Sequence, residues 1–77
     1  MSYGYSLNLV SLNKSANARS LGVKLGRTCI KHGVSVAEVA DRLGVSRQIV
    51  YRWFSGKNKP SEQMAIKIEK LITQLER

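Results

Sequence analysis

The chain has 77 residues, 43% of them hydrophobic, and a formal net charge of +8 from 13 lysines and arginines against 5 acidic residues. This length suits one small domain with one core, and the apolar fraction is too high for a disordered basic tail. One cysteine and one histidine exclude an intramolecular disulfide and leave too few ligands for a tetrahedral metal site, so we expect neither metal nor cofactor.

The positive charge is concentrated towards the N-terminus. Residues 1–33 carry five basic side chains and no acidic one, residues 34–59 carry five against two, and residues 60–77 carry three of each. Such a basic body indicates a polyanionic partner, either nucleic acid or an anionic membrane surface. The first residues lack the basic start of a targeting signal, and no apolar run approaches the about 20 residues of a membrane span, so we expect a cytoplasmic protein.

Residues 1–14 are expected to form an N-terminal arm ahead of a domain at residues 15–77. In the arm, apolar side chains at positions 5, 7 and 9 alternate with polar ones, which predicts a short extended segment or strand. From Ala16 to His32, apolar residues recur at spacings of three and four and predict a first helix, which Gly33 ends. Gly22 and Gly26 weaken this helix but permit close packing.

Three more helices follow in the sequence. Ser35 and Glu38 form a capping box that begins the second helix, and Gly44 ends it. Ser46 caps a third helix, which runs from Arg47 to about Ser55. Pro60 and Ser61 open the last helix, whose apolar positions are Met64, Ala65, Ile68, Leu71, Ile72 and Leu75.

The joint between the second and third helices carries the clearest functional signal. Two short helices joined by a turn at a glycine make a helix-turn-helix, and Ala40 is small where the two backbones approach. Apolar residues stand where this pair must face the other helices, namely Val39, Leu43, Val45, Val50 and Trp53.

The segment from about Leu21 to Ile72 resembles the Cro/C1-type (XRE-like) helix-turn-helix domains of phage and bacterial repressors. The likeness includes the run Leu43–Gln48 and the linker Gly56–Ser61 after the third helix. Two features depart from the family pattern: Val36 stands where many members have a glutamine that contacts the DNA backbone, and the usual fifth helix is missing. The resemblance implies an all-α, four-helix domain that inserts the helix 47–55 into the major groove of double-stranded DNA.

The polar face of the third helix is chemically suited to reading bases. Arginine can donate two hydrogen bonds to guanine, and glutamine can pair with adenine. Helical spacing and the resemblance together give the expected base-reading residues as Ser46, Arg47, Gln48, Tyr51 and Arg52. The expected contacts to the DNA backbone are Ser35, Ser55, Lys57, Asn58 and Lys59.

One recognition helix reads only a few base pairs, so we expect a homodimer on an inverted repeat. The resemblance places Ala65, Ile68 and Ile72 in the core, which leaves Met64, Leu71 and Leu75 to one side of the last helix for a dimer interface. Cys29 is expected in the core. Phe54 has three possible positions: against the arm, against a partner, or half-buried in the core.

The sequence therefore predicts a transcription regulator, most simply a repressor that blocks polymerase at its operator, in a bacterial cell or a phage-infected host. No nucleophile–base pair or carboxylate pair supports an enzyme, and no small-molecule ligand is expected. Activation stays open. The alternatives are an accessory factor in phage or mobile-element recombination, excision or packaging, and a protein-interaction module. Membrane-surface binding is disfavoured because the amphipathic last helix is nearly neutral.

Overall fold

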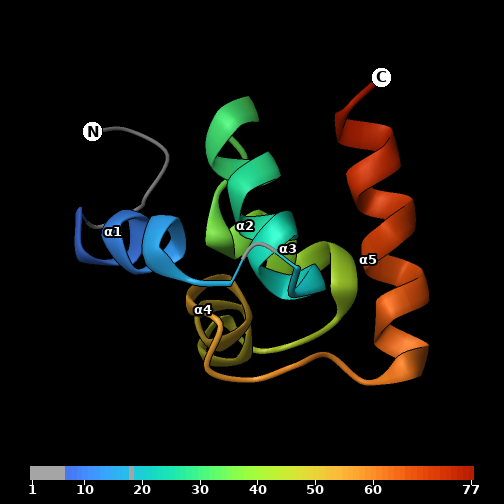
Figure 1. Ribbon diagram of the computed structural model, residues 1–77. Coiled ribbons are helices and arrows are strands. Elements are labelled where there is room, and N and C mark those ends of the chain that lie inside the picture. The colour runs from blue at the N-terminus through green and yellow to red at the C-terminus, as the bar shows by residue number, and fades with distance from the viewer. Residues whose placement is uncertain (1–6, 18) are drawn as a thin grey trace.

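The computed structural model describes residues 7–17 and 19–77, and these residues form helices joined by short loops (Figure 1). The helices are α1 (Leu7–Ser15), α2 (Leu21–His32), α3 (Val36–Leu43), α4 (Arg47–Ser55) and α5 (Glu62–Leu75). The described part of the chain contains no strand, which confirms the all-α class. It contains one helix more than the four expected, and the additional helix is α1.

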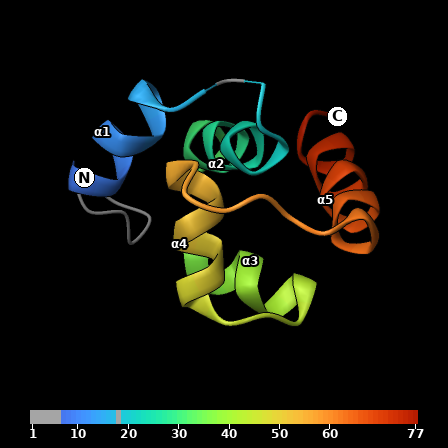
Figure 2. The same ribbon diagram turned by 60° about the horizontal axis from the view of Figure 1, so that its bottom comes forward.

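The central helix is α2, which packs against α1, α4 and α5. The short helix α3 packs on α4 and on α5. Helices α1 and α5 lie on opposite sides of α2 (Figures 1 and 2). The shared core takes residues from every helix, and its fully buried side chains include Val23, Leu25, Cys29, Val39, Val50, Phe54 and Ile68. Cys29 is therefore a core residue, as expected, and Phe54 is core rather than half-buried.

Serine side chains begin three of the helices as the sequence predicts. The hydroxyl oxygens of Ser35, Ser46 and Ser61 accept hydrogen bonds from backbone N–H groups three residues later, at 3.1, 3.3 and 3.2 Å. The expected second half of the capping box at Ser35 is replaced by an ion pair. The Glu38 carboxylate turns along α3 to Arg42 Nη2 at 2.7 Å, one helical turn later.

The N-terminal region differs from its prediction. Residues 7–9 begin α1 rather than an extended segment, and α2 begins at Leu21 rather than at Ala16. The break between these helices is local: the Asn17 side-chain oxygen accepts a hydrogen bond from Arg19 N at 2.9 Å, and Ser20 has the extended backbone of an N-cap residue. Position 5 of the predicted segment lies outside the described residues.

The last helix presents one apolar stripe instead of two apolar faces. Leu71 is only 3% exposed and lies in the core with Ile68 and Ile72, so its expected place at the side of α5 is wrong. Met64 and Leu75 are half-buried and pack against the same core. The spacing of three and four residues along this stripe explains the difference, because it keeps all five side chains on the side of α5 that faces α2 and α3.

Candidate nucleic-acid interface

The turn between α3 and α4 depends on the backbone of Gly44. Its φ of 69° lies in the left-handed region, and nothing stands within 4 Å of where a Cβ would be. The glycine is therefore needed for backbone conformation rather than for space. Gly44 N donates to Asp41 O at 3.3 Å and Val45 N donates to Ala40 O at 3.0 Å, which closes α3 and turns the chain directly into α4.

The two faces of α4 have opposite characters. Val50 is fully buried and Trp53 is 4% exposed, so this face holds the helix on the body. Four of the five expected base-reading side chains are exposed on α4 itself, and the fifth, Ser46, is the exposed N-cap at its start. Tyr51 is 40% exposed. The helix thus presents Ser46, Arg47, Gln48, Tyr51 and Arg52 to solvent.

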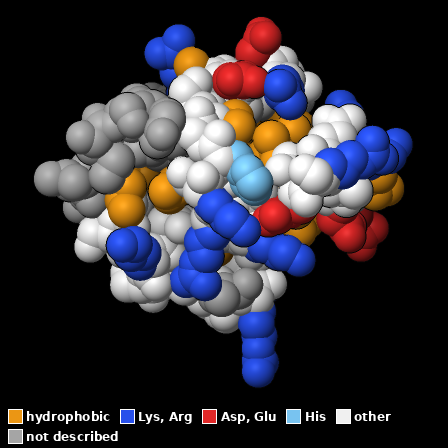
Figure 3. All heavy atoms as spheres, turned by 90° about the horizontal axis from the view of Figure 1, so that it is seen from above, with side chains coloured by type: hydrophobic (Ala, Val, Ile, Leu, Met, Phe, Trp, Pro, Cys, Tyr) orange, Lys and Arg blue, Asp and Glu red, His pale blue; other side chains and the backbone are white. Residues whose placement is uncertain are grey.

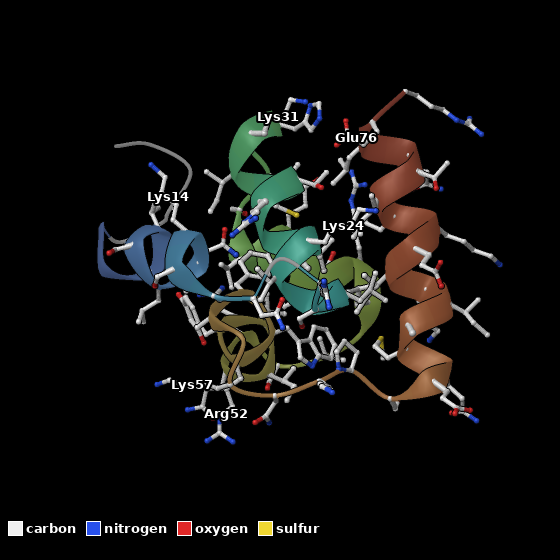
Figure 4. The ribbon with its side chains drawn as sticks, in the orientation of Figure 1. Lys14, Lys24, Lys31, Arg52, Lys57 and Glu76 are labelled. Atoms are coloured by element: carbon white, nitrogen blue, oxygen red, sulfur yellow. The ribbon has the colours of Figure 1, made fainter. Side chains whose placement is uncertain are left out.

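Among the described residues, no acidic side chain forms an ion pair with the basic side chains on this face. Within the part of the chain that the structure describes, the ion pairs join Glu76 to Lys31 and His32, and Glu38 to Arg42. None of these pairs engages the cations of α4 and its following loop, namely Arg47, Arg52, Lys57 and Lys59. Arg52 and Lys57 extend from the lower end of the molecule into solvent (Figure 4). Their charge is available to an anion.

The loop after α4 is folded against the end of that helix. Lys57 N and Asn58 N both donate to Arg52 O, at 2.9 and 3.3 Å. Lys57 and Lys59 are exposed, whereas Asn58 and Ser55 are half-buried. The Ser55 hydroxyl donates to Arg52 O at 3.4 Å and is directed to the helix.

At the start of α3, the Ser35 hydroxyl is occupied by its capping bond, and Val36 is 3% exposed. Residue 36 therefore packs in the core. It presents no polar side chain to solvent at the start of α3.

Sequence reasoning missed a contact between α1 and α4. Asn13 is 1% exposed, and its side-chain Nδ2 donates to Phe54 O at 2.7 Å and to Val23 O at 3.2 Å. The sequence carries only a slight signal of this contact. Asn13 stands four residues after the buried Leu9, and this spacing places both side chains on one side of a helix, but the sequence predicts an arm with an extended segment here.

The α3–α4 joint, the exposed polar face of α4 and its basic loop together define a helix-turn-helix DNA-binding domain. The helix-turn-helix family model of the XRE/Cro/C1 type matches residues 23–73, and the chain belongs to this family of regulators that bind double-stranded DNA. Comparisons with curated proteins and with solved structures found no match. Over the described residues, none of the helices has the length and apolar character needed to cross a membrane.

Proposed function

We propose that this protein represses transcription by binding an operator with α4 in the major groove. The observation that carries the proposal is the pair of faces on α4. Val50 and Trp53 bury one face in the core, and Arg47, Gln48 and Arg52 are exposed on the other, with no acidic partner among the described residues. A rigid helix with such side chains is what direct reading of base edges requires.

The proposed roles follow from chemistry and position. Arg47 and Arg52 pair with guanine, Gln48 pairs with adenine, and Ser46 and Tyr51 contact neighbouring base edges or thymine methyl groups. The DNA backbone is held by Lys57 and Lys59 through charge and by Asn58 through a hydrogen bond. The Ser35 O–H is also proposed to donate to a phosphate while its oxygen accepts the capping bond, and Ser55 does so once its hydroxyl turns away from Arg52 O. These backbone contacts fix the register of α4 on the duplex.

The protein is proposed to act in the cytoplasm of a bacterium or of a phage-infected cell, as a homodimer on its operator. Two copies double the number of base pairs that are read. The half-buried Met64 and Leu75 of α5 are the proposed apolar part of the contact between copies, whereas Leu71 lies in the core of its own chain.

Selection of bound duplexes from a random pool, at two salt concentrations, tests the proposal. We expect an enriched inverted repeat, and repression of a reporter gene when that site overlaps its promoter. Arg47→Ala and Gln48→Ala should each cost about 1–3 kcal/mol on the selected site and relax the preference at one or two positions. Lys14→Ala is the matched control, because Lys14 is exposed on α1 at the opposite end from Arg52 (Figure 4).

An unchanged sequence preference in both α4 variants contradicts the assignment of this face. If no sequence is enriched, the proposal that the protein is a sequence-specific regulator is wrong. If the enriched site activates the reporter, the DNA-binding role stands and only the repressor role is wrong.

A further inference from the structure

The C-terminal end of α4 is capped by the side chain of another helix. The last carbonyls of a helix have no N–H donor within that helix. Near the end of α4, Arg52 O accepts from Lys57 N and Asn58 N, and Trp53 O accepts from Gly56 N at 3.2 Å. Phe54 O accepts instead from Asn13 Nδ2 of α1, at 2.7 Å, in a buried environment. A helix that lies outside residues 23–73 thus completes the end of the proposed recognition helix.

The end of α1 is itself fastened to α2. Arg27 Nη2 donates to the carbonyl oxygens of Asn13, Lys14 and Ala16, at 3.4, 3.1 and 3.3 Å. A guanidinium is suited to this role because its planar donors can satisfy several helix-end carbonyls at once. Because the same residue, Asn13, receives the Arg27 bond and gives the bond to Phe54, the end of α1 is fixed to α2 on one side and to α4 on the other.

Steric fit leaves the Asn13 amide little freedom. A Cβ placed on Gly26 of α2 would lie 2.5 Å from Asn13 Nδ2 and 2.9 Å from Phe54 Cγ. The amide, the glycine backbone and the Phe54 ring therefore occupy one tightly packed site. The second bond of the amide, to Val23 O of α2 at 3.2 Å, ties the same group to the central helix. A shift of α4 along its axis would therefore disturb the Asn13–Phe54 hydrogen bond or the packing of the Phe54 ring beside Gly26.

From this geometry we infer that Asn13 is a positioning residue for DNA recognition, which sets the placement of α4 relative to α2 and so the register of its base-reading side chains. The inference rests on the proposed function of α4. Arg52 lies on the last turns of α4, two residues before Phe54, so loosening the α4 end displaces Arg52 more than the N-terminal Arg47, which the α3 turn holds.

The test compares Asn13→Leu with wild type on the selected operator and on a random duplex of equal length. Leucine keeps the branched shape of the side chain but cannot donate the hydrogen bonds to Phe54 O and Val23 O. We expect about a tenfold loss of affinity for the operator, equivalent to one misplaced base contact, with little change on the random duplex. The relaxed base preference should fall at the position read by Arg52. Hydrogen exchange at the amides of Lys57 and Asn58, which bond to Arg52 O, should become faster.

Ile72→Ala is the matched control for general destabilisation, since Ile72 is buried on α5, which packs on α2 and α3. Both variants are measured well below their melting temperatures. If Asn13→Leu does not fold, Asn13→Ala takes its place, because the smaller side chain relieves the contact at Gly26. A ratio of operator to random affinity that stays at the wild-type value, or falls equally in Ile72→Ala, overturns the inference. Absence of a selected operator for wild type overturns the proposed function instead.

Discussion

Burial is the main cause that sets the chemistry of the Cys29 side chain. Its thiol lies on α2 with no exposed surface. Burial, with a smaller contribution from the nearby Glu38 carboxylate, raises the pKa of the Cys29 thiol from 9.0 to about 12, against the opposing effect of Arg42. The thiol therefore stays protonated and unreactive in the folded protein at physiological pH, which fits a packing role.

This raised pKa predicts a loss of stability in alkali. Above pH 9.0 the unfolded thiol loses its proton while the folded thiol keeps it up to about pH 12, so unfolding becomes more favourable as the pH rises between these values. From about pH 8 to about pH 10, the contribution of Cys29 to the free energy of unfolding should fall by about 1.4 kcal/mol. Urea unfolding of wild type and Cys29→Ala at both pH values measures the difference, since the other titrating groups are common to both. Equal pH dependence in the two proteins would contradict the prediction.

At the scale of the element, the contact between α2 and α4 depends on missing side chains in α2. A Cβ on Gly22 would lie 2.7 Å from Trp53 Cβ and 2.9 Å from Trp53 O. The second of these atoms belongs to the α4 backbone, which cannot move aside without moving the helix. The two glycines of α2 therefore lower its helix propensity but let α4 approach closely, as the sequence predicts.

Gly22→Ala is expected to destabilise the protein although alanine is the better helix former. The gain in propensity is about 1 kcal/mol, and the overpacking against Trp53 costs about 1–3 kcal/mol plus displacement of α4. Lys24→Ala, at an exposed position of the same helix, provides the control and should change stability little. Thermal or urea unfolding measures both. A Gly22→Ala variant more stable than wild type would show that α2 and α4 can separate without cost.

The loop after α4 carries two lysines that are proposed to contact DNA phosphates. Lys57 and Lys59 are exposed and free of the described ion pairs, so each proposed phosphate contact should contribute through release of counterions. Lys57→Ala and Lys59→Ala should weaken binding to all sequences about equally, and each should lower the log–log salt slope by roughly one unit. Lys67→Ala on α5, also exposed, is the control. An unchanged slope in both loop variants would mean that the loop stays in solvent.

The elements that could be predicted from sequence are those with local signals. The limits of α3 and α4 follow from Ser35, Gly44 and Ser46, because capping and left-handed turns act within a few residues. The position of α1 depends instead on long-range packing of Leu9 and Asn13 on α2 and α4, and the short alternation at its start matches a strand equally well. The exposed face of α4 was predictable from its helical spacing. Its capping by Asn13 was not, because a polar side chain carries no sign of its distant partner.

At the scale of the whole molecule, positive charge is not confined to the α4 side. Lys14 and Lys31 stand at the end opposite to Arg52 and Lys57 (Figure 4), and basic side chains are spread among acidic and apolar ones on that face (Figure 3). The net charge of +8 therefore raises the rate of encounter with DNA from every direction, while the orientation on the duplex must come from the specific contacts of α4.

The apolar surface is spread in the same way. Among the described residues, the large exposed hydrophobic side chains are Leu12 at 37%, Tyr51 at 40% and Ile66 at 59%, and they lie on three different helices. A stable dimer normally buries a broad and contiguous apolar patch on each copy. The proposed contact through Met64 and Leu75, both half-buried already, is small by this measure. We therefore expect the two copies to associate on the operator, where DNA holds them at high effective concentration.

Assembly on the DNA should depend on the spacing between the two half-sites of the operator. The free protein should sediment as one chain at micromolar concentration, and two copies should bind the selected inverted repeat cooperatively. Inserting half a helical turn, about 5 base pairs, between the half-sites rotates the copies to different faces of the duplex and separates them, so the second copy should bind no better than to an isolated half-site. Gel shifts on the two duplexes, with a single half-site as control, measure the difference. A free protein that already sediments as two chains would contradict assembly on the DNA, because the dimer would then exist before binding. A second copy that binds equally tightly on both spacings would also contradict it, because the two copies would then bind independently of their contact.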